Sequence, residues 1–89
     1  MTETIETKRK RLHMRSIRRG IKEMDLILTA FATAELGTMD DADLDVYDAL
    51  LSENDHDLYQ WVSGTSVEPA PYRAMMGRIR AGAVGVTKP

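Results

Sequence analysis

Hydrophobic residues recur at three- and four-residue intervals along most of this chain, and that spacing most constrains how it can fold. The longest such series comprises Met14, Ile17, Ile21, Met24, Leu28 and Phe31. This spacing places side chains on one face of an α-helix. The chain contains no cysteine, so neither a disulfide nor a thiolate metal site can supplement its core. We therefore predict that the 89 residues form one small domain stabilised by helix packing alone.

Helix-start and helix-stop residues divide the chain into five segments, which predict an all-α fold, a compact five-helix bundle. We expect helices over about residues 7–17 and 20–36, then one each after Asp40, after Asn54 or Asp55, and from Pro69 and Pro71. The predicted buried residues of the last three helices include Leu44, Tyr47, Leu51, Leu58, Trp61, Tyr72, Met75, Met76 and Ile79. Gly37 is expected to end the second helix in a left-handed conformation. We assign residues 7–80 to the helical domain and expect residues 1–6 and 81–89 to be flexible.

Charge is unevenly distributed along the chain. Eight of the 12 basic residues lie between Lys8 and Lys22, whereas no Lys or Arg occurs from Glu23 to Tyr72, where 12 of the 14 acidic residues fall. Two explanations remain open at this point. The basic arm folds back onto the acidic body, or it meets a partner, which includes nucleic acid as an alternative.

Residues typical of catalysis or metal binding are sparse. His13 and His56 have no second histidine or cysteine at ligand spacing, no serine lies in a nucleophile elbow, and no glycine-rich phosphate loop follows a strand. Apolar runs such as Leu26–Leu28 fall far short of the roughly 20 residues that cross a bilayer. The N-terminus lacks the basic start and apolar stretch of a secretory signal. We expect a cytoplasmic protein that is not an enzyme and binds neither metal nor membrane.

The segment from Arg15 to Asp25 combines dense charge with a glycine. At helical spacing, Arg15, Arg18 and Asp25 would point outward, and Gly20 would leave bare backbone that another protein could approach closely. The alternative is a turn glycine flanked by solvated charges, with Glu23 paired to the arginine four residues earlier. The residues by themselves do not separate these two interpretations.

Two motifs in this chain resemble one known family. Arg19-Gly20-Ile21-Lys22-Glu23, extended to Asp25, is similar to the Arg-Gly-x-x-Glu-x-Asp signature of SdhE-type FAD assembly factors, the bacterial relatives of mitochondrial succinate dehydrogenase assembly factors. The segment Asp55–Trp61 resembles the family's Asp-Pro-Asp-Leu-aromatic-x-Trp segment, with His56 in place of the usual proline. The resemblance spans about residues 11–80. Because proline there only pre-sets the helical backbone, we expect the fold to survive its replacement.

The resemblance implies a function and a contact surface. Members of the family that it resembles are five-helix monomers that bind the flavoprotein subunit of succinate dehydrogenase, and often that of fumarate reductase. They promote covalent attachment of FAD to a histidine of that partner. It implies no stably bound cofactor in this chain itself. The implied contact residues are Arg19, Gly20 and Glu23, with Arg15, Arg18 and Asp25 as neighbours. Two alternatives remain: an antitoxin-like partner of a small toxin (a name that some relatives carry), and nucleic-acid binding through the basic N-terminal helix.

Overall fold

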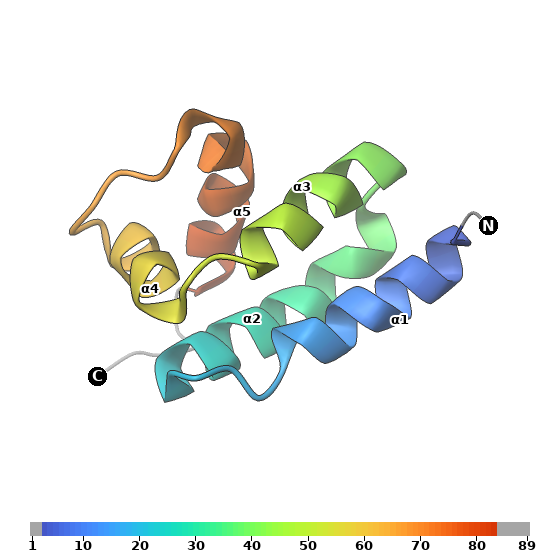
Figure 1. Ribbon diagram of the computed structural model, residues 1–89, viewed down its shortest axis with the longest axis horizontal. Coiled ribbons are helices and arrows are strands. Elements are labelled where there is room, and N and C mark those ends of the chain that lie inside the picture. Colours follow the sequence, from blue (N-terminus) through green and yellow to red (C-terminus); the bar gives the residue numbers. More distant parts are fainter. Residues whose placement is uncertain (1–2, 84–89) are drawn as a thin grey trace.

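The computed structural model describes residues 3–83, which form five α-helices and two single-turn 3-10 helices without a strand. In chain order they are α1 (Ile5–Ser16), α2 (Lys22–Glu35), η1 (Leu36–Thr38), α3 (Asp41–Leu51), α4 (Asp55–Ser63), η2 (Ala70–Tyr72) and α5 (Arg73–Ala83). Helices α1 and α2 lie antiparallel, α3 packs alongside α1, and α4 and α5 pack together at one end (Figure 1). The predicted all-α five-helix bundle is confirmed.

Side chains cap three of the helices at their N-termini. Thr4 accepts a hydrogen bond from the Thr7 amide at 3.1 Å, and Asp40 accepts one from the Asp43 amide at 2.8 Å. Asn54, one of two caps considered for the fourth helix, accepts one from the His56 amide at 2.8 Å. Each cap satisfies an amide that has no partner within its helix, so each fixes where its helix begins.

The continuous apolar face predicted across residues 14–31 is wrong. Helix α1 ends at Ser16, and the backbone of Ile17 is extended, so the three- and four-residue spacing is interrupted before α2 begins at Lys22. Met14, at 65% exposure, lies outside the core. The physical reason is that two antiparallel helices need a turn between them. The hydrophobic spacing continues through that turn although the helix does not.

Two other features differ from the sequence predictions. Gly37 is not left-handed but lies within η1, and Gly64, with φ of 83°, ends α4 in that conformation instead. Helical structure extends beyond the predicted 7–80, from Ile5 at one end to Ala83 at the other. The rest of the predicted flexible ends, residues 1–2 and 84–89, lies outside the described residues.

All five helices contribute to one hydrophobic core. Its members include Leu12, Met24, Ile27, Leu28, Phe31, Leu44, Tyr47, Leu50, Leu51, Leu58, Trp61, Met75, Met76 and Ile79. The predicted buried faces of the last three helices are confirmed, except that Tyr72 is half-buried against this core. Across residues 3–83, every helix is too short or too polar to traverse a bilayer.

Candidate partner-binding surface

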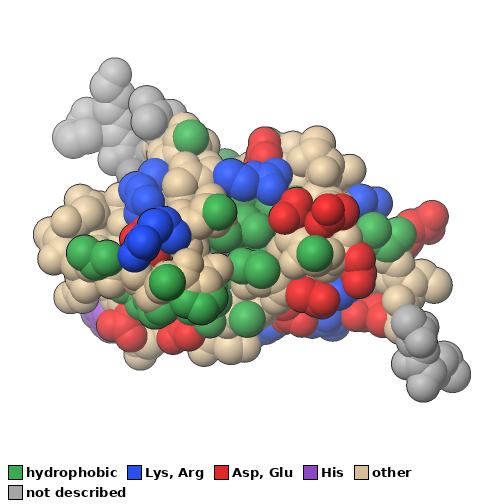
Figure 2. Space-filling model, turned by 90° about the horizontal axis from the view of Figure 1, so that it is seen from above, with side chains coloured by type: hydrophobic (Ala, Val, Ile, Leu, Met, Phe, Trp, Pro, Cys, Tyr) green, Lys and Arg blue, Asp and Glu red, His purple; other side chains and the backbone are tan. Residues whose placement is uncertain are grey.

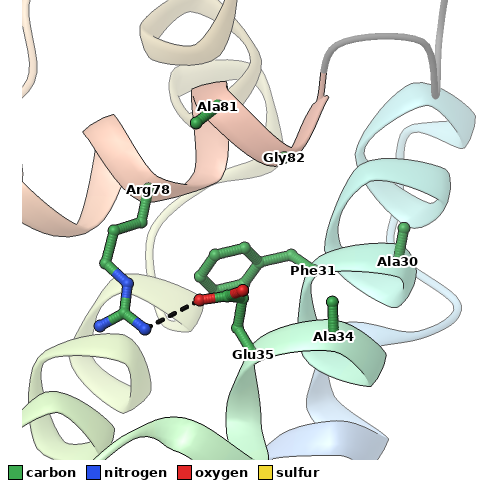
Figure 3. A pocket seen from close by; sticks show the side chains of 7 residues that line it. All are labelled: Ala30, Phe31, Ala34, Glu35, Arg78, Ala81 and Gly82. Carbon is green, nitrogen blue, oxygen red and sulfur yellow. Dashed lines mark hydrogen bonds and ion pairs between the residues drawn. The ribbon is translucent and has the colours of Figure 1, made fainter.

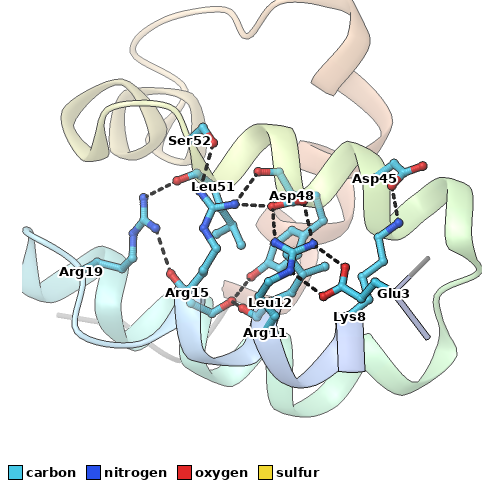
Figure 4. A network of polar contacts seen from close by, with 12 residues as sticks. Glu3, Lys8, Arg11, Leu12, Arg15, Arg19, Asp45, Asp48, Leu51 and Ser52 are labelled. Atoms are coloured by element: carbon cyan, nitrogen blue, oxygen red, sulfur yellow. Dashed lines mark hydrogen bonds and ion pairs between the residues drawn. The ribbon is translucent and has the colours of Figure 1, made fainter. Parts of the chain in front are cut away.

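The basic residues of α1 face the acidic residues of α3. We call six of these residues the α1–α3 charge seam: Lys8, Arg11, Arg15, Asp41, Asp45 and Asp48. Lys8 Nζ donates to Asp41 at 3.0 Å. It also contacts the Asp45 carboxylate (Figure 4). These hydrogen bonds, chiefly that to Asp45, raise the pKa of Lys8. The fold-back explanation of the uneven charge is therefore confirmed.

Asp48 is the centre of the seam because two arginines share it. Arg11 donates to both carboxylate oxygens of Asp48, at 3.1 and 3.0 Å, and Arg15 contacts the same carboxylate and the Asp48 carbonyl oxygen (Figure 4). Arg15 also donates to Ser52 Oγ at 3.0 Å. The hydrogen bond from Arg11 is the main reason that the pKa of Asp48 is lowered. A charged Asp48 thus holds α1 against α3.

Most of the basic arm is occupied in this way. Arg9 caps the end of α2 by donating to the carbonyl oxygens of Leu36, at 2.9 Å, and Met39, at 2.8 Å. Five of the eight basic residues between positions 8 and 22 donate to acceptors within the fold: Lys8, Arg9, Arg11, Arg15 and Arg19. This leaves few cations in the arm for phosphates, which weakens the nucleic-acid alternative.

The motif loop, residues 17–21, connects α1 to α2 in a strained conformation. Arg18 has φ of 56°, in the left-handed region that costs energy for a residue with a side chain. Its amide donates to Asp25 Oδ1 at 2.7 Å, so the first turn of α2 holds this conformation in place. Backbone strain of this kind is retained where surrounding contacts over-determine it, frequently at functional sites.

Asp55, at the start of α4, fixes the other half of the motif loop. Its two carboxylate oxygens accept hydrogen bonds from Arg19 Nε and from the Gly20 amide, each at 2.8 Å. The guanidinium of Arg19 also donates to the carbonyl oxygens of Arg15 and Leu51, at 2.9 and 3.1 Å. The Arg19 and Asp55 side chains are only 12% and 18% exposed. The two motif segments found in the sequence are therefore bonded directly to each other.

This arrangement gives Gly20 a steric role. A Cβ atom added at this position would lie 3.1 Å from Asp55 Oδ2, closer than most such contacts. The glycine therefore lets the loop backbone approach the carboxylate that binds it. The sequence had offered a pairing of Arg19 with Glu23, and that pairing is wrong, because Asp55 takes its place.

His56 occupies the position where the family pattern has proline. The residue is exposed, and its amide donates to the Asn54 cap, a hydrogen bond that proline could not make. Helix α4 still begins at Asp55. The expectation that the fold survives this replacement is confirmed.

The predicted contact residues divide into two groups. The side chains of Arg15, Arg19 and Asp25 and the Gly20 amide are bonded within the fold. Within residues 3–83, the side chains of Arg18 and Glu23 make no hydrogen bond or ion pair, and neither does exposed Lys22 between them in the chain. The first group thus holds the motif loop or, in the case of Arg15, the charge seam, and the second group has polar side chains without a partner in the described part of the chain.

An apolar hollow adjoins the motif loop, and the sequence did not predict it. It encloses about 550 Å³ and is lined by Ile17, Arg18, Asp25, Leu26, Thr29 and Ala30. Leu26 is 46% exposed, although it is a large hydrophobic residue. Its position two residues after buried Met24 places it off the buried face of α2, which was the signal available in the sequence.

A second hollow lies between α2 and α5 (Figure 3). Small side chains and Phe31 form much of its wall, and Arg78 donates to Glu35 at 2.9 Å across one side. That pairing raises the pKa of Arg78. The described residues contain no group of His, Asp and Glu arranged to hold a metal ion. The hollow therefore presents an ion pair, Arg78 with Glu35, beside small apolar side chains.

Comparison with known proteins identifies the family. Residues 10–83 match the model of the Sdh5 family, described as the flavinator of succinate dehydrogenase. Because this match covers most of the chain, the chain belongs to the Sdh5 family. The resemblance found in the two motifs is confirmed.

Named relatives agree with this assignment. The chain is 46% identical over 74 residues to mitochondrial succinate dehydrogenase assembly factor 2 of Candida glabrata, covering 82% of this chain and 48% of the relative. It is 47% identical over 72 residues to the protein of the same name from Meyerozyma guilliermondii, covering 80% of this chain and 53% of that protein. The chain thus spans about half the length of these relatives.

Proposed function

We propose that this chain is an assembly factor that binds the flavoprotein subunit of succinate dehydrogenase and promotes covalent attachment of FAD to that subunit. Membership of the Sdh5 family supports this proposal. The structure of the motif loop is the reason for assigning this function to a particular surface. Contacts from α2 and α4 hold the loop, while the Arg18 and Glu23 side chains have no partner within residues 3–83.

The residues of the motif loop would divide the work. Arg19, Asp25 and Asp55 position the backbone, and Gly20 allows the loop to lie close to Asp55. Arg18 would donate to a carboxylate or carbonyl group of the flavoprotein, a role suited to its forked guanidinium. Glu23 would make the complementary polar contact. Leu26, in the adjoining hollow, would add apolar area to the same surface.

Such a factor can act without catalytic groups of its own. Covalent attachment requires a histidine of the flavoprotein to meet the flavin in a reactive geometry, and the cofactor supplies its own chemistry. A partner that binds one conformation of the flavoprotein more tightly raises the population of that conformation. Holding reacting groups in place can contribute several kcal/mol to the barrier reduction. We therefore propose a chaperone role instead of an enzymatic one.

Covalent flavin can be measured directly. In-gel flavin fluorescence of the denatured flavoprotein would be compared in cells with the wild-type factor, without it, and with Arg18→Ala or Glu23→Ala. We expect both variants to fold and to lower covalent flavin toward the level without the factor. Gly20→Arg should lower it too, and should also destabilise the fold, because its side chain would press on Asp55.

Matched controls separate the surface from general charge effects. Arg73→Ala and Asp57→Ala remove exposed charges outside the motif loop and should leave covalent flavin unchanged. Unchanged flavin in cells that lack the factor would overturn the proposed function. Normal flavin with folded Arg18→Ala and Glu23→Ala would overturn the choice of surface. Repeating the comparison with the fumarate reductase flavoprotein would show whether it is also served.

A further inference from the structure

A third apolar hollow lies away from the motif loop, between α3 and η2, the short helix directly before α5. We call it the α3–α5 groove, with apolar walls formed by Val46, Ala49, Pro71 and Tyr72 and a rim that includes Asp45 and Glu53. It encloses about 410 Å³, and an adjoining hollow of about 200 Å³ shares Val46 and Pro71. Figure 2 shows hydrophobic side chains gathered near the middle of this face with acidic side chains beside them.

The rim of the groove carries more negative than positive charge. Glu53 accepts a hydrogen bond from the Tyr72 hydroxyl at 2.8 Å, but no Lys or Arg within residues 3–83 pairs with it. This hydrogen bond is also the main reason that the pKa of Tyr72 is raised. The other rim carboxylate, Asp45, pairs with Lys8, which it shares with Asp41.

The adjoining hollow shows the same imbalance. Arg78 is shared by two carboxylates, at 2.9 Å from Glu35 and 3.4 Å from Asp43. Three carboxylates, those of Asp43, Asp45 and Glu53, line the groove and the hollow, and Arg78 is the one cation among the lining residues. The groove therefore combines solvent-facing apolar walls with uncompensated negative charge.

We infer that the α3–α5 groove binds a segment of a partner protein in which apolar side chains alternate with lysine or arginine. The aliphatic stem of such a cation can lie along Val46 and the Tyr72 ring while its charged end reaches Glu53. An acidic segment would be repelled by the rim. A purely apolar segment would remove water from the carboxylates without giving them a partner. A segment with both apolar and basic side chains would contact the apolar walls and pair with the rim carboxylates at the same time.

A peptide titration tests this inference without reference to flavin attachment. The full ¹⁵N-labelled chain would be titrated with a 12-residue peptide of leucine, alanine and lysine, and with the same peptide carrying glutamate for lysine. We expect amide shifts concentrated at Val46, Ala49, Glu53 and Tyr72 with the lysine peptide alone. Binding should weaken as salt rises, since the rim charges are exposed to solvent.

Paired variants sharpen the test. Glu53→Gln should weaken peptide binding roughly two- to five-fold, as expected for one solvent-exposed ion pair, while Asp57→Asn on α4 should leave it unchanged. Ala49→Lys should abolish binding by placing a cation in the groove. Ala42→Lys, at another exposed position of α3, should not. Both lysine variants should keep the wild-type circular dichroism spectrum.

Three results would overturn the inference. The first is equal binding of the lysine and glutamate peptides, and the second is shifts that fall on the motif loop instead of the groove. The third is concentration-dependent shifts at the groove residues without peptide, which would mean that a second copy of this chain occupies the groove. None of these results depends on whether the flavoprotein proposal holds.

Discussion

The α1–α3 charge seam and the motif loop are built from the same kinds of residues, yet they differ in where their charges go. In the seam, Arg11 and Arg15 share Asp48, so cations and anions satisfy each other within the fold. In the motif loop, internal contacts are made by the backbone of Arg18 and Gly20 and by Arg19. The Arg18 and Glu23 side chains are left without a partner in the described part of the chain.

This difference separates stability from recognition within a run of about fifteen residues. A basic run in a sequence is easily read as a surface for an acidic partner, but here most of that charge fastens α1 to α3. Exposed ion pairs contribute little individually, so the seam stabilises through shared acceptors and partial burial. The loop, by contrast, spends internal hydrogen bonds on holding a strained backbone. The following predictions test whether the two regions are separable in this way.

The largest effect should come from Asp55, which holds the motif loop from α4. Asp55→Ala would leave the mostly buried Arg19 guanidinium and the Gly20 amide without their acceptor. We expect the free energy of unfolding to fall by about 2–3 kcal/mol, because an unpaired, partly buried charge is costly. Urea unfolding followed by circular dichroism measures this. Covalent flavin should fall as well, even at a temperature where the variant is fully folded.

Asp57→Ala is the matched control, since it removes an exposed carboxylate from the same turn of α4. Its stability should stay within about 0.5 kcal/mol of wild type. Equal stability of Asp55→Ala and Asp57→Ala would show that the loop is not held by Asp55. The claim that Asp55 holds the motif loop, as Asp48 holds the charge seam, would then be wrong.

Asp48 tests the seam, with an effect on stability and none expected on recognition. Asp48→Ala should lower the free energy of unfolding by about 1–2 kcal/mol at pH 7, because Arg11 and Arg15 lose the carboxylate that they share. The pKa of Asp48 is lowered in the fold, so its contribution is complete above the unfolded carboxyl pKa near about 4 and is lost as pH falls through the lower folded value. The stabilities of wild type and variant should therefore converge in acid.

Covalent flavin in cells with Asp48→Ala should match wild type once the variant is folded. A loss of flavin out of proportion to the loss of stability would place the seam in the recognition surface. That result would contradict the separation of the two regions.

Local signals in the sequence were sufficient for the helices and much of the core. Asp40 and the spacing of Leu44, Tyr47 and Leu51 predicted a helix that begins directly after Asp40, as α3 does. Caps and periodicity depend on neighbours in the chain, which a sequence displays directly. The break between the first two helices was predicted within two residues, but the hydrophobic spacing ran on through the turn and wrongly predicted one continuous apolar face.

Long-range pairing was beyond what the sequence could specify. The six candidate contact residues came from the motif, but which of them bond internally depends on Asp55, some 36 positions from Arg19. Glu23 lies at ideal helical spacing from Arg19 and was the obvious local partner. It was displaced because Arg19 precedes α2 and the spacing rule applies only within one helix. The exposure of Leu26, by contrast, could have been found, because its position falls off the predicted face formed by Met24 and Leu28.

A smaller effect is expected from the buried hydroxyl pair beneath the seam. The Tyr47 hydroxyl lies 2.6 Å from Ser16 Oγ, so Tyr47→Phe should cost about 1 kcal/mol at pH 7. Burial raises the pKa of Tyr47 to about 12, so its contribution is complete below pH 10 and is lost as pH rises toward 12. The stability difference should therefore narrow in alkali. Tyr59→Phe, on exposed α4 surface, is the control and should change stability little.

The smallest and most discriminating effect should come from Arg18, where strain and recognition coincide. Arg18→Gly removes the side chain and relieves the left-handed backbone, whereas Arg18→Ala removes the same charge but keeps a Cβ. We expect the glycine variant to be more stable than the alanine variant by up to about 1 kcal/mol. Glycine removes the strain of the left-handed backbone, and this stabilises the fold by more than the extra conformational entropy that glycine loses on folding destabilises it. Both should lower covalent flavin equally, because both lack the guanidinium. A glycine variant that is more stable and still fully active would show that Arg18 contributes strain without recognition, and Glu23 would then be the remaining candidate contact.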